Sequence, residues 1–247
     1  MEIIAEPPRR ALVVTPHPDD CEGGCGGTLA KWIKESGTEV VVVLCTNGDK
    51  GTSVRNMPSR ALAAIREREQ QEASNMLGAK EVVFLAHPDG GLEDTMVFRG
   101  QLVREMRRHR PDAILCIDPY RSVSHTHRDH RISGQAALDA AFTYAWSYLH
   151  FPEQITQEGL APHRVKDAYL WGSESPDTFV DIHDYLVLKA ESLGRHASQM
   201  SSNPVEREER VRQGAARQGE TAGVAYAEGF RRLRFDIGSA AWQFLNR

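Results

Sequence analysis

The fold of this chain is decided at Thr15-Pro16-His17-Pro18-Asp19-Asp20-Cys21-Glu22, which directly follows a short apolar run at residues 11–14. An apolar run of this length predicts a buried strand. Proline on both sides of His17 fixes φ and disfavours helix at each preceding residue, so we expect a stiff, extended loop that presents the polar side chains. Imidazole and carboxylate groups are the ligands that zinc and similar divalent ions take in proteins. The stretch therefore indicates half of a metal site.

Apolar residues recur along the first 150 residues in a pattern that alternates short buried strands with amphipathic helices. The expected strands lie at residues 11–14, 40–46, 81–85 and 113–117. The expected helices lie at residues 27–36, 61–77, 92–109 and 132–148. This alternation predicts an α/β fold with a doubly wound, mostly parallel sheet, helices on both faces and a strand order of about 3-2-1-4-5.

The remainder of the chain is less periodic. The further elements expected there are strands at residues 165–171 and 178–182 and a helix at residues 185–199. Pro204 marks the first turn of another helix, which opens a charged segment that reaches about Arg234. Because no clear linker or repeat interrupts the sequence, we expect one domain over residues 1–247, with a core at about 11–150 and a C-terminal elaboration at about 151–247.

The composition is that of an ordinary globular protein, with 40% hydrophobic and 26% charged residues among 247. A net charge of −4 gives no basic footprint for nucleic acid, and no apolar run approaches the roughly 20 residues of a membrane span. Four cysteines are too few for a disulfide scaffold, and the first residues lack the pattern of a signal peptide. We therefore expect a cytoplasmic protein with no nucleic-acid partner and no membrane insertion.

A second polar cluster, Ser124-His125-Thr126-His127-Arg128-Asp129-His130, follows the fourth expected strand. Both clusters therefore lie at the carboxyl edge of the predicted sheet. In the predicted order, strands 1 and 4 are neighbours at the point where the winding reverses, and ligands bind in the crevice outside that point. We expect the two clusters to face each other across this crevice.

The metal ligands are assigned by reach. His17 and Asp20 are three residues apart on a tight loop and can turn to one ion, and His130 completes a His-Asp-His set. A catalytic zinc takes three protein ligands and keeps a position for water. The sequence therefore predicts a divalent metal held by these three side chains.

The residues beside these ligands predict hydrolysis of an acyl bond. Asp19 lies next to Asp20 and is a natural general base for the attacking water. His127, held as an imidazolium by Asp129, could donate to an oxyanion or protonate a leaving amine. We therefore count Asp19, His127 and Asp129 as candidate catalytic residues.

Two motifs of the chain resemble those of a known family. Residues 16–22 (PHPDDCE) look like the (A/P)HPDD-x-E signature of the LmbE-like, PIG-L superfamily of zinc-dependent N-acetylglucosaminyl deacetylases, and residues 127–130 (HRDH) resemble its HPDH motif. Arg128 stands where that motif usually has proline. The resemblance extends over about residues 11–235 through an R-x-x-E pair at Arg66 and Glu69, Lys189 with residues 196–199 (HASQ), and residues 227–231 (AEGFR).

The resemblance implies a Rossmann-like three-layer fold, a bound divalent ion that is usually Zn²⁺, and a homo-oligomer. Fe²⁺ stays open, because His/Asp ligand sets accept both ions. The implied reaction removes an acetyl or other acyl group from a small N-acyl amino sugar, a glycoconjugate or a related amide. The family's metal ligands, base and transition-state stabiliser stand at the positions assigned above, and the position of Arg66 contacts substrate.

Further candidate substrate contacts come from outside the two motifs. Asn47 and Asp49 follow the second expected strand and so lie at the same edge of the sheet. His196 is included because its segment resembles part of the family, although a helix end explains it equally well. His125 has no counterpart in the motif.

Two other interpretations of the same residues stay open. Residues 24–26 (Gly-Cys-Gly) begin a fingerprint typical of nucleotide-binding oxidoreductases, but the third glycine position is Leu29 and two aspartates stand where a pyrophosphate must lie. A non-catalytic module that binds sugar or metal would keep the ligands but would not need Asp19. Cys21 and Cys25 have no matching second thiol pair, so we interpret them as small apolar side chains.

Overall fold

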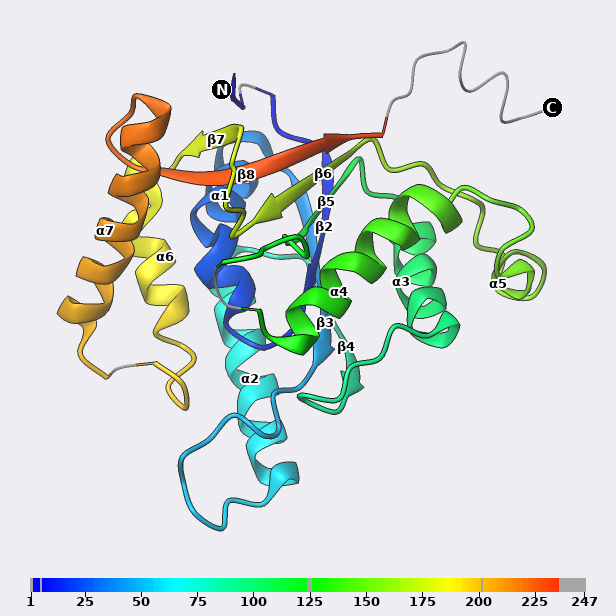
Figure 1. Ribbon diagram of the computed structural model, residues 1–247, viewed down its shortest axis with the longest axis horizontal. Helices are drawn as coiled ribbons and strands as arrows, with labels where there is room; N and C mark the ends of the chain where they lie inside the picture. The colour runs from blue at the N-terminus through cyan, green and yellow to red at the C-terminus, as the bar shows by residue number, and fades with distance from the viewer. Residues whose placement is uncertain (1, 5, 124–125, 201, 236–247) are drawn as a thin grey trace.

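The computed structural model describes residues 2–4, 6–123, 126–200 and 202–235, which form one eight-stranded sheet with helices on both faces (Figure 1). The order across the sheet is β1-β7-β8-β6-β5-β2-β3-β4. The strands are β1 (Glu2–Ile3), β2 (Arg10–Thr15), β3 (Glu39–Thr46), β4 (Glu81–His87), β5 (Ala113–Ile117), β6 (Asp167–Trp171), β7 (Thr178–Asp181) and β8 (Ala227–Arg234).

The half of the sheet from β4 to β6 confirms the predicted order. Read from β4, the strands run β4-β3-β2-β5-β6, all paired in parallel, which is the order 3-2-1-4-5 of the expected strands. β2, β3 and β5 are buried along almost their whole length. Strands covered by helices on both faces read as continuous apolar runs, which explains why the sequence located them well.

The helices form the two outer layers. Figure 1 shows α1, α2, α6 and α7 on one side of the sheet and α3 and α4 on the other, so the fold is the expected three-layer α/β architecture. The helices are α1 (Asp20–Ser36), α2 (Ser59–Leu77), α3 (Met96–His109), α4 (Arg128–Asp139), α5 (Pro152–Thr156), α6 (Leu186–Leu193) and α7 (Pro204–Ala222), with a π-turn η1 (Ala140–Tyr144) after α4 and a 3₁₀ turn η2 (His183–Tyr185) before α6. Among these helices, none combines the length and the apolar character needed to cross a bilayer.

The C-terminal part contains a strand that the sequence did not predict. α7 begins at Pro204 as expected, but it ends before Gly223, whose φ of 75° is left-handed, and the charged segment continues as β8. β8 lies between β6 and β7 and is antiparallel to both. The Glu228 carboxylate accepts hydrogen bonds from the backbone N–H groups of Gly27 (3.0 Å) and Thr28 (2.7 Å), which ties this strand to α1.

The two helices that follow the polar motifs begin at least four residues earlier than the sequence predicted. α1 begins at Asp20 rather than residue 27, and Gly24 lies where a bulky side chain presses against the helix: a Cβ there would lie 2.3 Å from the Trp171 ring. α4 begins at Arg128 rather than residue 132, so His130 belongs to its first turn. The extended loops expected around both motifs are therefore shorter, and each motif ends in a helix start.

Candidate metal centre and active site

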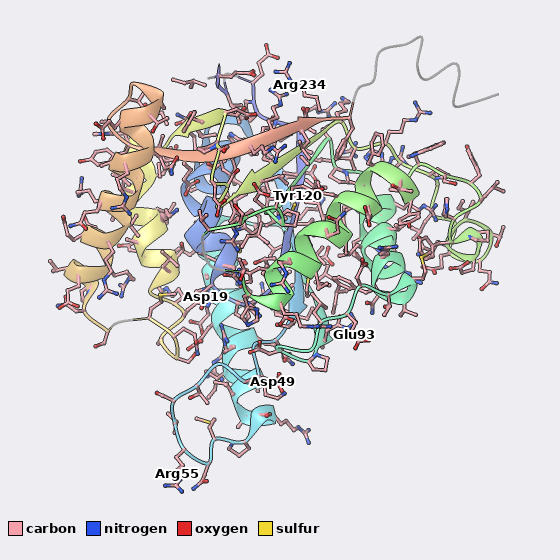
Figure 2. The ribbon with its side chains drawn as sticks, in the orientation of Figure 1. Asp19, Asp49, Arg55, Glu93, Tyr120 and Arg234 are labelled. Carbon is pink, nitrogen blue, oxygen red and sulfur yellow. The ribbon has the colours of Figure 1, made fainter. Side chains whose placement is uncertain are left out.

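The site lies at the carboxyl edge of the sheet, where β2 and β5 pair directly. Thr46 at the end of β3 donates to the Pro16 carbonyl through its backbone N–H (3.0 Å) and its hydroxyl (2.9 Å), which fixes the start of the loop after β2. Figure 2 shows Asp19 and Asp49 at this edge, away from Arg234 at the end of β8. The two polar clusters therefore face each other, as the sequence predicted.

Three nitrogen and oxygen atoms form a small triangle at the centre of the site. His17 Nδ1 lies 3.1 Å from Asp20 Oδ2 and 3.3 Å from His130 Nε2, and the last two atoms are 3.2 Å apart. Three atoms that bind one tetrahedral zinc at ~2.0–2.1 Å stand about 3.3 Å from one another. The three side chains therefore fit a zinc-sized ion with little movement.

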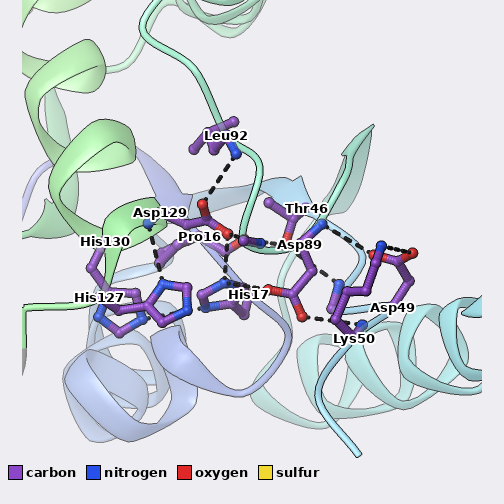
Figure 3. A network of polar contacts seen from close by, with 12 residues as sticks. Pro16, His17, Thr46, Asp49, Lys50, Asp89, Leu92, His127, Asp129 and His130 are labelled. Atoms are coloured by element: carbon purple, nitrogen blue, oxygen red, sulfur yellow. Dashed lines mark hydrogen bonds and ion pairs between the residues drawn. The ribbon is translucent and has the colours of Figure 1, made fainter.

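The second nitrogen of His17 faces two other carboxylates (Figure 3). His17 Nε2 lies 3.0 Å from Asp129 Oδ2 and 3.2 Å from Asp89 Oδ1. Asp129 is completely buried and also accepts hydrogen bonds from the backbone N–H groups of Gly90 (2.7 Å) and Leu92 (3.1 Å). A histidine that binds a metal usually gives its other ring N–H to such a carboxylate, which sets the tautomer and orients the ring.

The contact of Asp129 with His17 corrects one expectation. The carboxylate does not hold His127 as an imidazolium; instead, the backbone N–H of Asp129 donates to His127 Nδ1 at 3.2 Å, at the beginning of α4. Burial, followed by the charge of His17, lowers the pKa of His127 below its usual value. A neutral His127 that accepts at Nδ1 carries its proton on Nε2. Its ring centroid is 4.8 Å from that of His17, so it lies close enough to serve the same centre.

The electrostatics of the centre favour a cation. Burial alone would lower the pKa of His17, but hydrogen bonds to Asp129, Asp20 and Asp89 outweigh it and raise this pKa to about 11. Burial would likewise raise the pKa of Asp20, but hydrogen bonds from His130 and His17 hold it well below its usual range. The carboxylates around His17 are negative enough to keep it protonated. The same negative charge would stabilise a divalent ion at this point.

Asp19 has a different environment from its neighbour Asp20. Its carboxylate lies 3.2 Å from Nη2 of Arg66. Burial and the charge of Asp20 raise the pKa of Asp19 to about 7, while Arg66 acts in the opposite direction. A carboxylate with a pKa near neutrality can both accept and return a proton at physiological pH, as a general base must.

The candidate substrate contacts lie in different surroundings, and some of them support the loops of the site. Arg66 is buried and donates to the carbonyls of Gly48 (3.0 Å) and Pro18 (2.9 Å) as well as to Asp19, so it braces the loops of the site. Asp49 accepts a hydrogen bond from the Asp89 backbone N–H at 3.1 Å and so shapes the turn that carries Asp89.

Two further candidates lie around these loops. Asn47 donates to Glu67 on α2 at 3.2 Å. The expectation for His196 is corrected, because this side chain is completely buried, 3.3 Å from the carboxylate of Glu22, and presents no surface to a substrate.

Two residues of the centre are not predicted from the sequence. Asp89 stands in the turn after β4, and Arg121 reaches His130 Nδ1 at 3.2 Å. Asp89 could have been found, because β4 ends at the same edge of the sheet as β2 and β5. Arg128, in place of the usual proline, donates to the Leu92 carbonyl at 3.1 Å and joins α4 to this turn. His125 lies outside the described residues.

Comparison with known proteins agrees with this geometry. The PIG-L family model, described as GlcNAc-PI de-N-acetylase, matches residues 12–141. A diacetylchitobiose deacetylase of Thermococcus kodakarensis is 32% identical over 224 residues, which cover 90% of this chain and 82% of that protein. A probable N-acetyl-alpha-D-glucosaminyl L-malate deacetylase 2 of Bacillus anthracis is 27% identical over 80% of this chain and 84% of its own length.

Similarity to a solved structure covers nearly the whole chain. The N,N'-diacetylchitobiose deacetylase from Pyrococcus horikoshii, solved with an inhibitor, superimposes with a TM-score of 0.85 at 31% identity, covering 96% of this chain and 89% of that chain. The matched region includes both polar clusters of the site. The resemblance found in the sequence is therefore confirmed, and the chain belongs to the PIG-L (LmbE-like) family.

Proposed function

We propose that this protein is a metal-dependent deacetylase that hydrolyses the acetamide of a small N-acetylated amino sugar, with His17, Asp20 and His130 as ligands of Zn²⁺. The observation that carries the proposal is the triangle of ligand atoms 3.1–3.3 Å apart, with the Asp19 carboxylate, paired with Arg66, immediately before Asp20 in the sequence. The relatives named above act on N-acetylated sugars, which supports this substrate class. Fe²⁺ is the alternative ion, since the same donor set accepts it.

The chain's own residues supply the proton transfers. A bound zinc would supply a Lewis acid that polarises the acetyl carbonyl and makes water more acidic. Asp19 accepts a proton from the attacking water and returns it to the nitrogen of the amine as the C–N bond breaks. His127 donates its Nε2 hydrogen to the carbonyl oxygen as negative charge develops there. One amide and one water thus give an amino sugar and acetic acid, which ionises to acetate and a proton, and Asp19 ends in its starting state.

The surroundings of the centre disfavour the alternative of a dinucleotide site. Asp19, Asp20, Asp89 and Asp129 all gather at the edge of the sheet where a pyrophosphate would have to lie. Negative charge at that point repels a phosphate group. The single-domain organisation, the homo-oligomer and the cytoplasmic location stay predictions.

The proposed function is tested by acetate release from N-acetylglucosamine, diacetylchitobiose and N-acetylglucosaminyl malate, with the protein loaded with Zn²⁺ or Fe²⁺. We expect release from at least one of these substrates, and a 10²–10⁴-fold lower kcat in Asp19→Asn, because a positioned general base contributes about that much. His17→Gln and His130→Gln are expected to lose the metal, as measured by elemental analysis. Full activity of Asp19→Asn, or equal activity with and without metal, would contradict the mechanism.

A further inference from the structure

The backbone of Asp19 adopts a conformation that its side chain does not favour. Its φ is 90° and its ψ is −25°, a left-handed geometry that non-glycine residues seldom adopt. Such a conformation persists only where the surrounding contacts enforce it. The residue proposed as general base is therefore held in place by something other than its own preference.

Two side chains of α2 hold Asp19 from opposite ends. Arg66 contacts the Asp19 carboxylate at 3.2 Å and the Pro18 carbonyl at 2.9 Å. Gln70, one turn further along the same face of α2, accepts a hydrogen bond from the Asp19 backbone N–H through Oε1 at 3.3 Å. Gln70 is completely buried, so water cannot replace this contact without entering the core.

The orientation of the Gln70 amide is dictated by its partners. Its Nε2 donates to Glu22 Oε1 at 2.7 Å and to Ser74 Oγ at 3.0 Å. A carboxylate only accepts hydrogen bonds and a backbone N–H only donates, so an exchange of the amide oxygen and nitrogen would break both contacts. Gln70 can therefore present only its oxygen to Asp19.

Glu22 anchors Gln70 from the first turn of α1. Its side chain is completely buried, and its second oxygen accepts from Cys21 Sγ at 3.1 Å and lies 3.3 Å from His196 Nε2. A fully buried carboxylate needs hydrogen-bond partners, and Glu22 has them in the Gln70 amide and the Cys21 thiol. A continuous set of polar contacts thus runs from His196 through Glu22 and Gln70 to the Asp19 backbone.

We propose that Gln70, oriented by the buried carboxylate of Glu22, is a positioning residue that holds Asp19 in its left-handed conformation so that the carboxylate faces the metal centre. The inference rests on the proposed function of Asp19 as general base. Gln70 acts through the backbone of Asp19 and contacts neither the metal ligands' side chains nor a substrate.

The test compares Gln70→Leu with Ser74→Ala in the metal-loaded protein. Leucine has a similar size and removes every hydrogen bond of the amide, whereas Ser74→Ala removes one contact of Gln70 and none of Asp19. We expect kcat of Gln70→Leu to fall about 10–100-fold with KM and metal content unchanged, the range seen when a residue that orients a catalytic group is lost. Ser74→Ala is expected to stay within twofold of the wild-type kcat.

A structural readout decides the inference independently of activity. In a crystal structure of Gln70→Leu, Asp19 is expected to leave the positive-φ region, while Ser74→Ala keeps it. If Gln70→Leu does not fold, Gln70→Asn, whose shorter amide cannot span the distance from α2 to both partners, is expected to show the same two effects. An unchanged Asp19 backbone, or a kcat equal to that of Ser74→Ala, would overturn the inference. If the wild type releases no acetate, the proposed function is refuted but the role of Gln70 is not. The comparison of the Asp19 backbone in the two variants still decides whether Gln70 holds its conformation.

Discussion

At the scale of single residues, His17 shows how surroundings divide one side chain between two tasks. Its Nδ1 faces Asp20 and His130, and its Nε2 faces Asp129 and Asp89. Because Asp129 is fixed by two backbone N–H groups, its carboxylate is a rigid reference for the imidazole ring. The proton on Nε2 is thereby favoured, which leaves Nδ1 for the ion.

Replacement of Asp129 by asparagine tests this division. The amide has one acceptor oxygen, so its NH₂ group must face a backbone N–H or the His17 ring. We expect Asp129→Asn to bind zinc about 10–100-fold more weakly, measured by competition with a chromophoric chelator. Asp139→Asn, on the same helix but outside the centre, serves as the control and should bind as the wild type does. Wild-type affinity in Asp129→Asn would show that the carboxylate does not orient His17.

Residue types and spacing were sufficient to predict that His17, Asp20 and His130 meet. They could not predict the partner of Asp129, since that depends on which way a side chain points from the first turn of α4. Asp89 was overlooked because an aspartate before glycine is common in turns. His196 was misplaced because the sequence does not show that the turn after α6 buries it against Glu22.

At the scale of elements, the centre depends on helices that start very close to the strands. α1 begins at Asp20, directly after the loop of β2, and α4 begins two residues before His130. The prolines around His17 indicated a loop correctly, but proline is also common just before a helix, and the glycines obscured the helix that follows. The role of a glycine such as Gly24 is apparent only from the structure, which shows the Trp171 side chain packed against it.

Gly134 allows the close approach of α4 to the sheet. A Cβ at this position would lie 2.4 Å from the Ile117 carbonyl and 3.1 Å from Pro119 Cδ. The first of these neighbours is the backbone of β5, which cannot rotate away as a side chain could. Gly134 lies one turn after His130, so the distance between α4 and β5 also sets the position of this proposed ligand.

A pair of glycine substitutions tests the importance of this approach. Gly134→Ala should lower the free energy of unfolding by about 1–3 kcal/mol, as overpacking does, and should weaken zinc binding by displacing His130. Gly23→Ala in α1 is the matched control, because a Cβ there would meet no atom within 4 Å. It should raise the stability by about 0.5–1 kcal/mol, the helix preference of alanine over glycine. Denaturant unfolding measures both, and equal behaviour of the two variants would contradict the prediction.

At the scale of the whole molecule, the parallel half of the sheet could be predicted and the other half could not. Continuous apolar runs identify β2, β3 and β5, and the switch point between β2 and β5 places the site. β8 gives no such signal, because Arg231, Arg232 and Arg234 make its sequence resemble a charged surface helix. Only pairing with β6 and β7, distant in the sequence, makes this segment a strand.

The stability of the whole molecule should decrease in mild acid through His163. Its Nε2 lies 2.7 Å from the Pro111 carbonyl, and burial is the largest cause that lowers its pKa, while this contact acts in the opposite direction. The folded pKa is therefore below the unfolded value of about 6.5, and the unfolded chain binds the proton more readily. The contribution of His163 is complete above about pH 6.5 and is lost as pH falls toward the folded pKa.

Urea unfolding at pH 7.5 and pH 5.5 checks this expectation. The wild type should lose more of its free energy of unfolding between the two pH values than His163→Gln does, since glutamine carries no titrating group. An equal loss in both proteins would show that His163 does not contribute to the pH dependence.

The central position of β8 has a consequence for biosynthesis. Among the described strands it is the last to leave the ribosome, yet β6 and β7 pair with each other only through it. Until residues 227–234 have been made, a nascent chain exposes an unpaired edge on β6 and another on β7. Exposed edges of this kind invite pairing with other chains. A chain whose translation pauses before residue 227 is therefore expected to aggregate more readily than one that has completed β8.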